Sequence, residues 1–474
     1  MRYSTLVSVL FLAGSVAHAQ GVAGDAAAPS GLVTIDKPRL DDLRLDWCRD
    51  WSQLCGKPAA DEFCRRQGHV AAAAFARASR VGERTRVIGT GQICSNSSCD
   101  GFSSITCSTA AAATATTSST PAGLGQCHQG VHPDQRIAAC TALIERGQVG
   151  KETLAAAYLD RCDAYAFKAR YDQALADCGK AIELNPTDPQ GFATRSRIHV
   201  VKRSYAPATQ DISEALRLKP QDASLYHDRG SIHSAAGAPD RALDDYTEAL
   251  RLDPNSAQVH ITRGVLYSNV NRLAEALADF DAVIGINPKS HVAYFNRGSV
   301  YRKMGDQPHA IADYGEAIRL EPTYVLAHLR RADTYGDLRQ YDRAVAGYGE
   351  AIALKPKDPL LYCLRAGAST EGGQYANALA DFGEALRIDP GFAVAYNGRA
   401  WTLFKMGRAA EGLADVERAL ELQPQLSHAY DTRAHIYEVL GRKAEAIADF
   451  RRALALTSTI RASQEGLKRL GAAP

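Results

Sequence analysis

The sequence HVAYFNRGSVYRKMGDQPHAIADYGEAIRLEPTY, residues 291–324, is one of nine consecutive units of 34 residues that begin at residue 155. We call these units repeats 1 to 9 and count the positions within each from 1 to 34. Proline occupies position 32 in all but the last repeat, and alanine or glycine occupies position 20 throughout. A recurrence at this period predicts a stack of similar structural units. The residues at position 32 are Pro186, Pro220, Pro254, Pro288, Pro322, Pro356, Pro390, Pro424 and Ser458.

Each repeat has the pattern of two antiparallel helices. In residues 291–324, Tyr294, Gly298 and Tyr301 share one face of a first helix, and Ala310 and Tyr314 share one face of a second. A glycine and a proline between them predict the turn, and the proline at position 32 ends the second helix. One hairpin of this size cannot bury its apolar faces alone, so neighbouring hairpins must stack.

The 34-residue period, the small residues at positions 8 and 20, the aromatic residues at position 24 and the terminal proline resemble the tetratricopeptide repeat (TPR) family over residues 155–458. The resemblance implies an all-α fold, a right-handed superhelical solenoid of nine helix hairpins. Residues 127–154 are then a capping half repeat, since PDQRIAACTALI at residues 133–144 resembles YDQALADCGKAI of repeat 1. Residues 459–474 are expected to form a C-terminal solvating helix.

In the TPR family the first helices line a concave groove, so the resemblance implies that binding residues lie there. Trp401 beside Phe404 and Lys405 has the composition of a protein-binding hot spot, although packing against a neighbouring repeat is an equal alternative. Position 5 has no lysine in any repeat, which disfavours the lysine/asparagine clamp by which some relatives hold a partner's C-terminal carboxylates. The candidate groove residues are Phe295, Ser299, Arg302, Lys303, Leu329, Asp333, Asp337, Asn397, Trp401, Phe404 and Lys405.

Position 7 is arginine in every repeat, and position 23 is aspartate in all but repeat 6, which has Gly347. A file of arginines could bind an anionic polymer, but a matching file of aspartates favours bidentate pairs within the scaffold. If each pair forms within one repeat, Arg331 has no partner and is solvated. If instead each aspartate pairs with the arginine of the following repeat, Arg365 is the arginine without a partner. Position 7 adjoins the small position 8, where the two helices of a hairpin meet, so we expect pairs within each repeat.

Residues 1–19 have the pattern of a secretory signal peptide. Arg2 precedes an apolar run at residues 6–16, and the small residues Ala17 and Ala19 predict cleavage near Ala19. A single membrane anchor is disfavoured because the apolar run is too short to span a bilayer. We therefore expect an exported protein, periplasmic or secreted, with no membrane span.

Residues 20–39 are rich in alanine and glycine and are predicted to be disordered, and residues 40–107 form a cysteine-rich module. Six cysteines in so short an exported segment predict three disulfides, because a small module buries too little apolar surface to be stable alone. We expect a helix within residues 61–78 and a tight hairpin or loop at residues 94–107. The six are Cys48, Cys55, Cys64, Cys94, Cys99 and Cys107.

Residues 108–126 are rich in Ser, Thr and Ala and are expected to be a flexible linker. The remaining cysteines lie in the helical part. Cys127 with Cys140, and Cys162 with Cys178, are candidates for two further disulfides, which leaves Cys363 as a free thiol.

Metal and cofactor sites are not expected. Cys94 and Cys99 have no matching second pair, and His69 is the only histidine of the cysteine-rich module. Near the linker, Gly130 and Pro133 prevent the neighbouring histidines at 128 and 132 from sharing a helix face, so a loop is favoured there over a metal site.

The composition points to a binding protein. A formal net charge of +2 gives no electrostatic case for nucleic acid, and no nucleophile, base and orienting group converge in the sequence as an enzyme requires. We expect an exported protein-protein interaction scaffold that binds a protein or extended peptide, with its oligomeric state open. The alternative is that the cysteine-rich module binds a carbohydrate or envelope polymer and the TPR array acts as a spacer.

The cysteine assignment has a direct test. Mass spectrometry of the mature protein without reductant should show no free thiol among the six cysteines of residues 40–107, since an oxidising compartment favours disulfides. Stoichiometric zinc together with titratable thiols would contradict this prediction.

Overall fold

The chain forms two compact units, residues 1–125 and 126–474, in the computed structural model. The structure describes the seven strands of the first unit as backbone, and residues 127–128 and 132–473 of the second. Residues 1–19, predicted to be a signal peptide, residues 109–126 of the predicted linker, and Cys48, Cys55, Cys64, His69 and Cys99 lie outside the described residues.

The described part of the first unit consists of two small sheets. One has the strand order β1-β7-β4 with antiparallel pairing, and Ile35 of β1 lies opposite Ile105 of β7. The other has the order β2-β3-β5-β6. The strands are β1 (Leu32–Asp36), β2 (Arg39–Leu40), β3 (Leu43–Leu45), β4 (Ala71–Ala78), β5 (Thr85–Arg86), β6 (Ile93–Cys94) and β7 (Gly101–Ser108).

Three expectations for this unit are wrong. The all-α class does not extend to it, because residues predicted as the end of a helix form strand β4, where pairing with β7 overrides the helix propensity of an alanine-rich segment. The predicted disorder of residues 20–39 fails at Leu32–Asp36, which alternates Val33 and Ile35 as a strand does. Of the two alternatives for residues 94–107, the tight hairpin is wrong, since β6 pairs with β5 and β7 pairs with β1 and β4, and residues 95–100, where a loop would lie, are outside the described residues.

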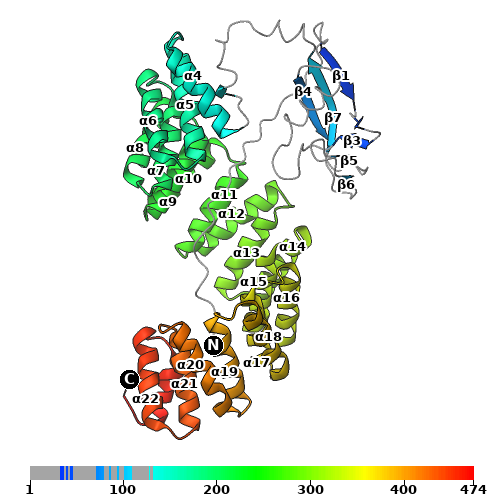
Figure 1. The fold of residues 1–474 in the computed structure, drawn as a ribbon, viewed down its shortest axis with the longest axis vertical. Helices are drawn as coiled ribbons and strands as arrows, with labels where there is room; N and C mark the ends of the chain where they lie inside the picture. Colours follow the sequence, from blue (N-terminus) through cyan, green and yellow to red (C-terminus); the bar gives the residue numbers. More distant parts are fainter. Residues whose placement is uncertain are drawn as a thin grey trace. The chain divides into compact units, whose positions relative to one another are not determined.

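The second unit is a run of helix hairpins, one for each repeat, that follow one another in chain order (Figure 1). Helix α4 (Pro133–Arg146) precedes the first hairpin and α23 (Arg461–Arg469) follows the last. The second helix of repeat 8 begins with a short 3-10 turn, η1 (Ala409–Gly412). The hairpins are α5 (Lys151–Phe167) with α6 (Tyr171–Leu184), α7 (Pro189–Val201) with α8 (Tyr205–Leu218), α9 (Ala223–Ala235) with α10 (Pro239–Leu252), α11 (Ala257–Asn269) with α12 (Leu273–Ile286), α13 (His291–Met304) with α14 (Gln307–Leu320), α15 (Val325–Asp337) with α16 (Tyr341–Leu354), α17 (Pro359–Glu371) with α18 (Tyr375–Ile388), α19 (Ala393–Lys405) with α20 (Leu413–Leu422), and α21 (Ser427–Val439) with α22 (Lys443–Leu456).

Close approach of the two helices explains the small residues at positions 8 and 20. A Cβ atom on Gly298 would lie 3.1 Å from the Tyr314 ring and 3.2 Å from the carbonyl oxygen of Ala310. Repeat 8 exchanges the two small residues, with Ala400 at position 8 and Gly412 at position 20. There a Cβ on Gly412 would lie 2.9 Å from the Ala400 carbonyl oxygen, too close for an alanine at position 20 without a shift of the backbone.

Arginine and aspartate pair within the repeat, as predicted. In repeat 5, Arg297 donates from Nε and Nη2 to the two carboxylate oxygens of Asp313, each at 2.8 Å. The aspartate is buried and both of its oxygens are satisfied, so the pair links the two helices of one hairpin. The other pairs are Arg161–Asp177, Arg195–Asp211, Arg229–Asp245, Arg263–Asp279, Arg365–Asp381, Arg399–Asp415 and Arg433–Asp449.

The expectation that Arg331 is unpaired is wrong. Its Nη2 donates to the carboxylate of Glu350 at 2.7 Å. Glutamate at the corresponding position of repeat 5, Glu316, pairs instead with Arg319, three residues further on. Repeat 6 has Ala353 at that place, so Glu350 is available to replace the missing aspartate.

Two disulfides are present in the helical unit. Cys127–Cys140 connects the segment before α4 to that helix, and Cys162–Cys178 joins α5 to α6 at positions 8 and 24 of repeat 1. Cys363 is a free, buried thiol on α17, and burial raises its pKa to about 12.

The C-terminal helix α23 covers the end of the last repeat with Ser463, Gly466 and Leu467. Its opposite side is exposed to solvent, as the solvating role requires. The exposed residues of this side include Gln464, Glu465, Lys468 and Arg469.

The repeat 6 exception generates a stability prediction. Arg365→Leu leaves the buried Asp381 carboxylate unpaired and should lower the free energy of unfolding by about 3 kcal/mol. Arg331→Leu leaves Glu350, whose side chain is 49% exposed, and should cost less than about 1 kcal/mol. Urea unfolding followed by circular dichroism measures both variants, and equal losses would contradict this account.

Candidate protein-binding surface

The candidate residues of repeats 5 and 6 lie together on the first helices α13 and α15. Phe295 is half-buried, with its ring centroid 5.1 Å from that of Tyr324 and 5.7 Å from that of Tyr314. Leu329 on α15 is also half-buried and packs against the Ala332–Tyr348 core. Each of these two apolar side chains packs against the core on one side and is partly exposed to solvent on the other. Residues that anchor a partner on a binding surface have this arrangement.

Polar contacts connect three consecutive first helices around these apolar residues. Arg302 on α13 donates from Nη2 to Asp337 on α15 at 2.7 Å. Lys303 donates from Nζ to the hydroxyl of Ser268 on α11 at 2.9 Å, and burial lowers the pKa of Lys303. Arg302 and Asp337, both expected to face a partner, therefore already form an ion pair with each other.

Tyrosine hydroxyls of the second helices also reach this surface, which the sequence analysis missed. Tyr314 donates to Ser299 at 3.2 Å, and Tyr348 donates to Asp333 at 2.7 Å. In repeat 3, Tyr246 lies 3.2 Å from Ser231 in the same way.

A signal for these contacts exists in the sequence. Position 24 is tyrosine in repeats 3, 5 and 6, whose position 9 is Ser or Asp, whereas repeat 1, with Asp163 at position 9, has the disulfide-bonded Cys178 at position 24. Where position 24 is phenylalanine, position 9 carries no hydroxyl or carboxylate, as with Val265, Gly367 and His435. A tyrosine at position 24 thus fixes a polar group of the first helix rather than only filling the core.

The candidate residues of repeat 8 form a separate aromatic group on α19. The Trp401 ring stacks on Phe404 with centroids 5.1 Å apart, and both rings contact His435 of α21. Lys405 is exposed. Asn397 is only 3% exposed, so its assignment to a solvent-facing surface is wrong. In repeats 7 to 9, unlike repeats 3 to 6, the residue at position 5 of the first helix is buried.

The indole of Trp401 is half-buried, and its Nε1 has no hydrogen-bond partner in the described chain. Position 24 of this repeat is Val416 instead of an aromatic residue. His435, which sequence reasoning did not single out, sits between Trp401 and the Phe450 ring at 4.9 Å, and burial lowers its pKa. Packing therefore accounts for much of the Trp401 side chain.

The described part of the chain has neither the ligand cluster of a metal site nor a membrane-spanning helix. No group of three His, Cys, Asp or Glu side chains there has the arrangement of a metal site. His128 instead lies 3.0 Å from the Asp160 carboxylate. No described helix has the length and apolar character needed to cross a bilayer.

Comparisons with protein families match the repeats directly. A tetratricopeptide repeat model matches residues 227–291, 329–391 and 397–459, and a second matches residues 155–188. A TPR repeat model matches residues 298–339. The chain is a tetratricopeptide repeat protein. The match at residues 155–188 coincides with repeat 1 and confirms the register of this TPR array.

Three solved structures illustrate the range of similarity. YrrB, described as a TPR protein with an unusual peptide-binding site, is 27% identical, with 40% of this chain and 96% of YrrB covered and a TM-score of 0.34. A TPR protein from Parabacteroides merdae is 21% identical, with 60% and 98% covered and a TM-score of 0.38. Yeast Tom70 is 15% identical, with 72% and 91% covered and a TM-score of 0.39. The search of curated proteins found no match.

The environment of Trp401 in this TPR protein predicts how substitutions behave. Trp401→Phe keeps an aromatic ring against Phe404 and removes an N–H that has no partner, so it should cost about 1 kcal/mol. Trp401→Ala should cost about 3 kcal/mol because it leaves a cavity. Thermal unfolding compares the two, and a loss in Trp401→Phe equal to that in Trp401→Ala would show that the indole N–H has a structural partner.

Proposed function

We propose that this TPR protein is an exported interaction scaffold that binds an extended peptide segment of a partner along the first helices of its middle repeats. The observation that carries the proposal is the pair Phe295 and Leu329. Both are half-exposed apolar side chains on adjacent first helices, held from below by Tyr314 and Tyr348 of the second helices. An extended peptide places alternate side chains on one side, and these two side chains offer it apolar contacts on two adjacent helices.

The polar groups around the anchors are held in place before a partner arrives. Ser299 and Asp333 accept hydrogen bonds from buried tyrosines, and Arg302 is fixed by Asp337. A peptide backbone meeting groups that are already ordered loses less conformational entropy on binding than it would against mobile side chains. The arrangement therefore favours recognition of a backbone and apolar side chains over capture of a strongly charged partner.

Export belongs to the same proposal. It is supported by the signal-peptide pattern of residues 1–19 and by the disulfides Cys127–Cys140 and Cys162–Cys178, which persist in oxidising compartments. In the alternative proposal, the cysteine-rich module binds a carbohydrate or envelope polymer, and the TPR array acts as a spacer. Its support is the change of composition and fold class between residues 1–125 and 126–474.

The test uses peptides selected from a phage-displayed library on the full chain, with affinities then measured by fluorescence polarisation. Phe295→Ala should weaken binding by about 2 kcal/mol, with helical content unchanged. Leu329→Ala should also weaken it, whereas Leu354→Ala, a leucine 38% exposed at the end of a second helix, should not.

The outcomes separate the two proposals. Equal affinities for the Leu329→Ala and Leu354→Ala variants would contradict binding on the first helices. Pull-downs from an exported fraction, with residues 20–125 and 126–474 expressed separately, identify the unit that holds the natural partner. Retention by residues 20–125 alone would favour the cysteine-rich module.

A further inference from the structure

The two most exposed large apolar side chains near the N-terminal end of the array lie at position 13, the last residue of the first helix. Phe167 in repeat 1 is 81% exposed and Val201 in repeat 2 is 59% exposed. Neither contributes to a core, so packing does not explain them. In repeats 3 to 8 the same position is small or polar, as Ala235, Asn269, Lys303, Asp337, Glu371 and Lys405.

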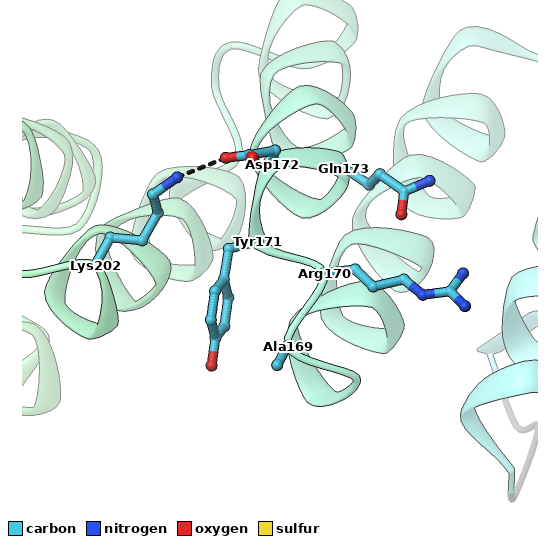
Figure 2. A pocket seen from close by; sticks show the side chains of 6 residues that line it. All are labelled: Ala169, Arg170, Tyr171, Asp172, Gln173 and Lys202. Atoms are coloured by element: carbon cyan, nitrogen blue, oxygen red, sulfur yellow. Dashed lines mark hydrogen bonds and ion pairs between the residues drawn. The ribbon is translucent and has the colours of Figure 1, made fainter.

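A pocket opens beside these residues, between the turn of repeat 1 and the end of α7. Its volume is about 320 Å³, and its lining includes Tyr171, whose ring packs on the Cys162–Cys178 core cluster. Figure 2 shows Lys202 reaching Asp172 across the pocket, with Nζ and Oδ1 2.5 Å apart. Phe167 precedes the lining residue Ala169 by two positions in the sequence, and Val201 directly precedes the lining residue Lys202. The full lining is Ala169, Arg170, Tyr171, Asp172, Gln173 and Lys202.

The surface around the pocket is basic. Two of its four cations are paired, Lys168 with Asp134 and Lys202 with Asp172. No carboxylate in the described part of the chain lies within ion-pair distance of the other two, Arg170 and Arg203. Arg170 is near enough to Asp134 to help lower the pKa of that carboxyl, but neither arginine is held in an ion pair, so both guanidinium groups can turn to an incoming anionic group.

The two turns that carry these residues share one backbone conformation, each closed by a backbone hydrogen bond, from Ala169 to Ala166 and from Arg203 to Val200. Ala169 and Arg203 are at the same position of their turns and both adopt the left-handed conformation, with φ of 56° and 57°. The Cys162–Cys178 disulfide joins the two helices on either side of the first turn. A site on these turns is ordered before a ligand binds, which reduces the entropic cost of binding.

We infer that the turn patch, defined as Phe167, Val201, Arg170, Arg203 and the pocket between them, binds a short peptide segment of a partner in which an apolar side chain stands next to acidic residues. The apolar side chain covers Phe167 and Val201 and enters the pocket, and the carboxylates pair with Arg170 and Arg203. This inference is independent of the peptide surface on the middle repeats, because it uses different residues on different helices.

Exposed apolar residues beside arginines and lysines also occur on proteins that bind anionic membranes. Two features favour a peptide. A pocket of this size accepts one side chain, and the Lys168 and Lys202 ion pairs leave only two of the four cations free, a weak field for a lipid surface.

The test begins with a phage-displayed 12-residue library selected on the full chain and depleted on the Phe167→Ser/Val201→Ser double variant. Clones that survive depletion should carry Asp or Glu next to an apolar residue. Synthetic versions should bind the double variant at least ten-fold more weakly, and the Arg170→Glu/Arg203→Glu variant likewise. Val439→Ser is the matched control, since Val439 is 64% exposed at the same position of repeat 9, and it should bind these peptides with unchanged affinity.

Three results would overturn the inference. They are the absence of clones that distinguish the wild type from the double variant, selected peptides that are basic or purely apolar, and Phe167-dependent sedimentation with vesicles of phosphatidylglycerol and phosphatidylcholine. The last would assign the turn patch to a lipid surface. Thermal unfolding of each variant verifies that the exposed substitutions leave the fold intact.

Discussion

The contact between the two helices of each hairpin, where the residue at position 8 meets positions 20 and 24, constrains the rest of the TPR array. The backbones are so close that a glycine or alanine is needed on one side, and an aromatic ring on the other fills the remaining space. Because the helices lie at this distance, position 7 can place an arginine over the aspartate at position 23 of the same repeat. The ion pairs and the tyrosine contacts to position 9 both follow from one packing distance.

This constraint explains why exceptions to the pattern come in pairs. The missing side chain at Gly412 accompanies a close approach of the Ala400 carbonyl oxygen on the facing helix, and the absence of aspartate at Gly347 accompanies the release of Glu350 by Ala353. In repeat 1 a disulfide stands in for the small and aromatic pair. A buried arginine without any anion would be costly, so a change on one helix is tolerated where the second helix supplies a compensating group.

The period of 34 residues was sufficient to predict the hairpins, their register and the partner of every arginine but one, because these depend on contacts within a single repeat. What depends on contacts between repeats was not predictable in the same way. Asn397 occupies position 5 of repeat 8, as the half-exposed Phe295 does in repeat 5, yet Asn397 is buried. The strand Ala71–Ala78 was mistaken for helix because its alanines favour helix locally, and only its pairing with β7 decides otherwise.

The change along position 5 also indicates where partners can be met. This position is half-buried in repeats 3 to 6 and buried in repeats 7 to 9, where Asp431, with no exposed surface, accepts a hydrogen bond from Ser463 of the terminal helix α23. A carboxylate so enclosed serves the packing of α23 and is not accessible to a ligand. Among the first-helix residues at position 5 of repeats 3 to 9, the partly exposed large apolar side chains consequently lie in the middle repeats, as Phe295 and Leu329. Since a stack of hairpins is stabilised mainly by its nearest neighbours, surfaces in different repeats can change independently, and one array can present two binding surfaces of different chemistry.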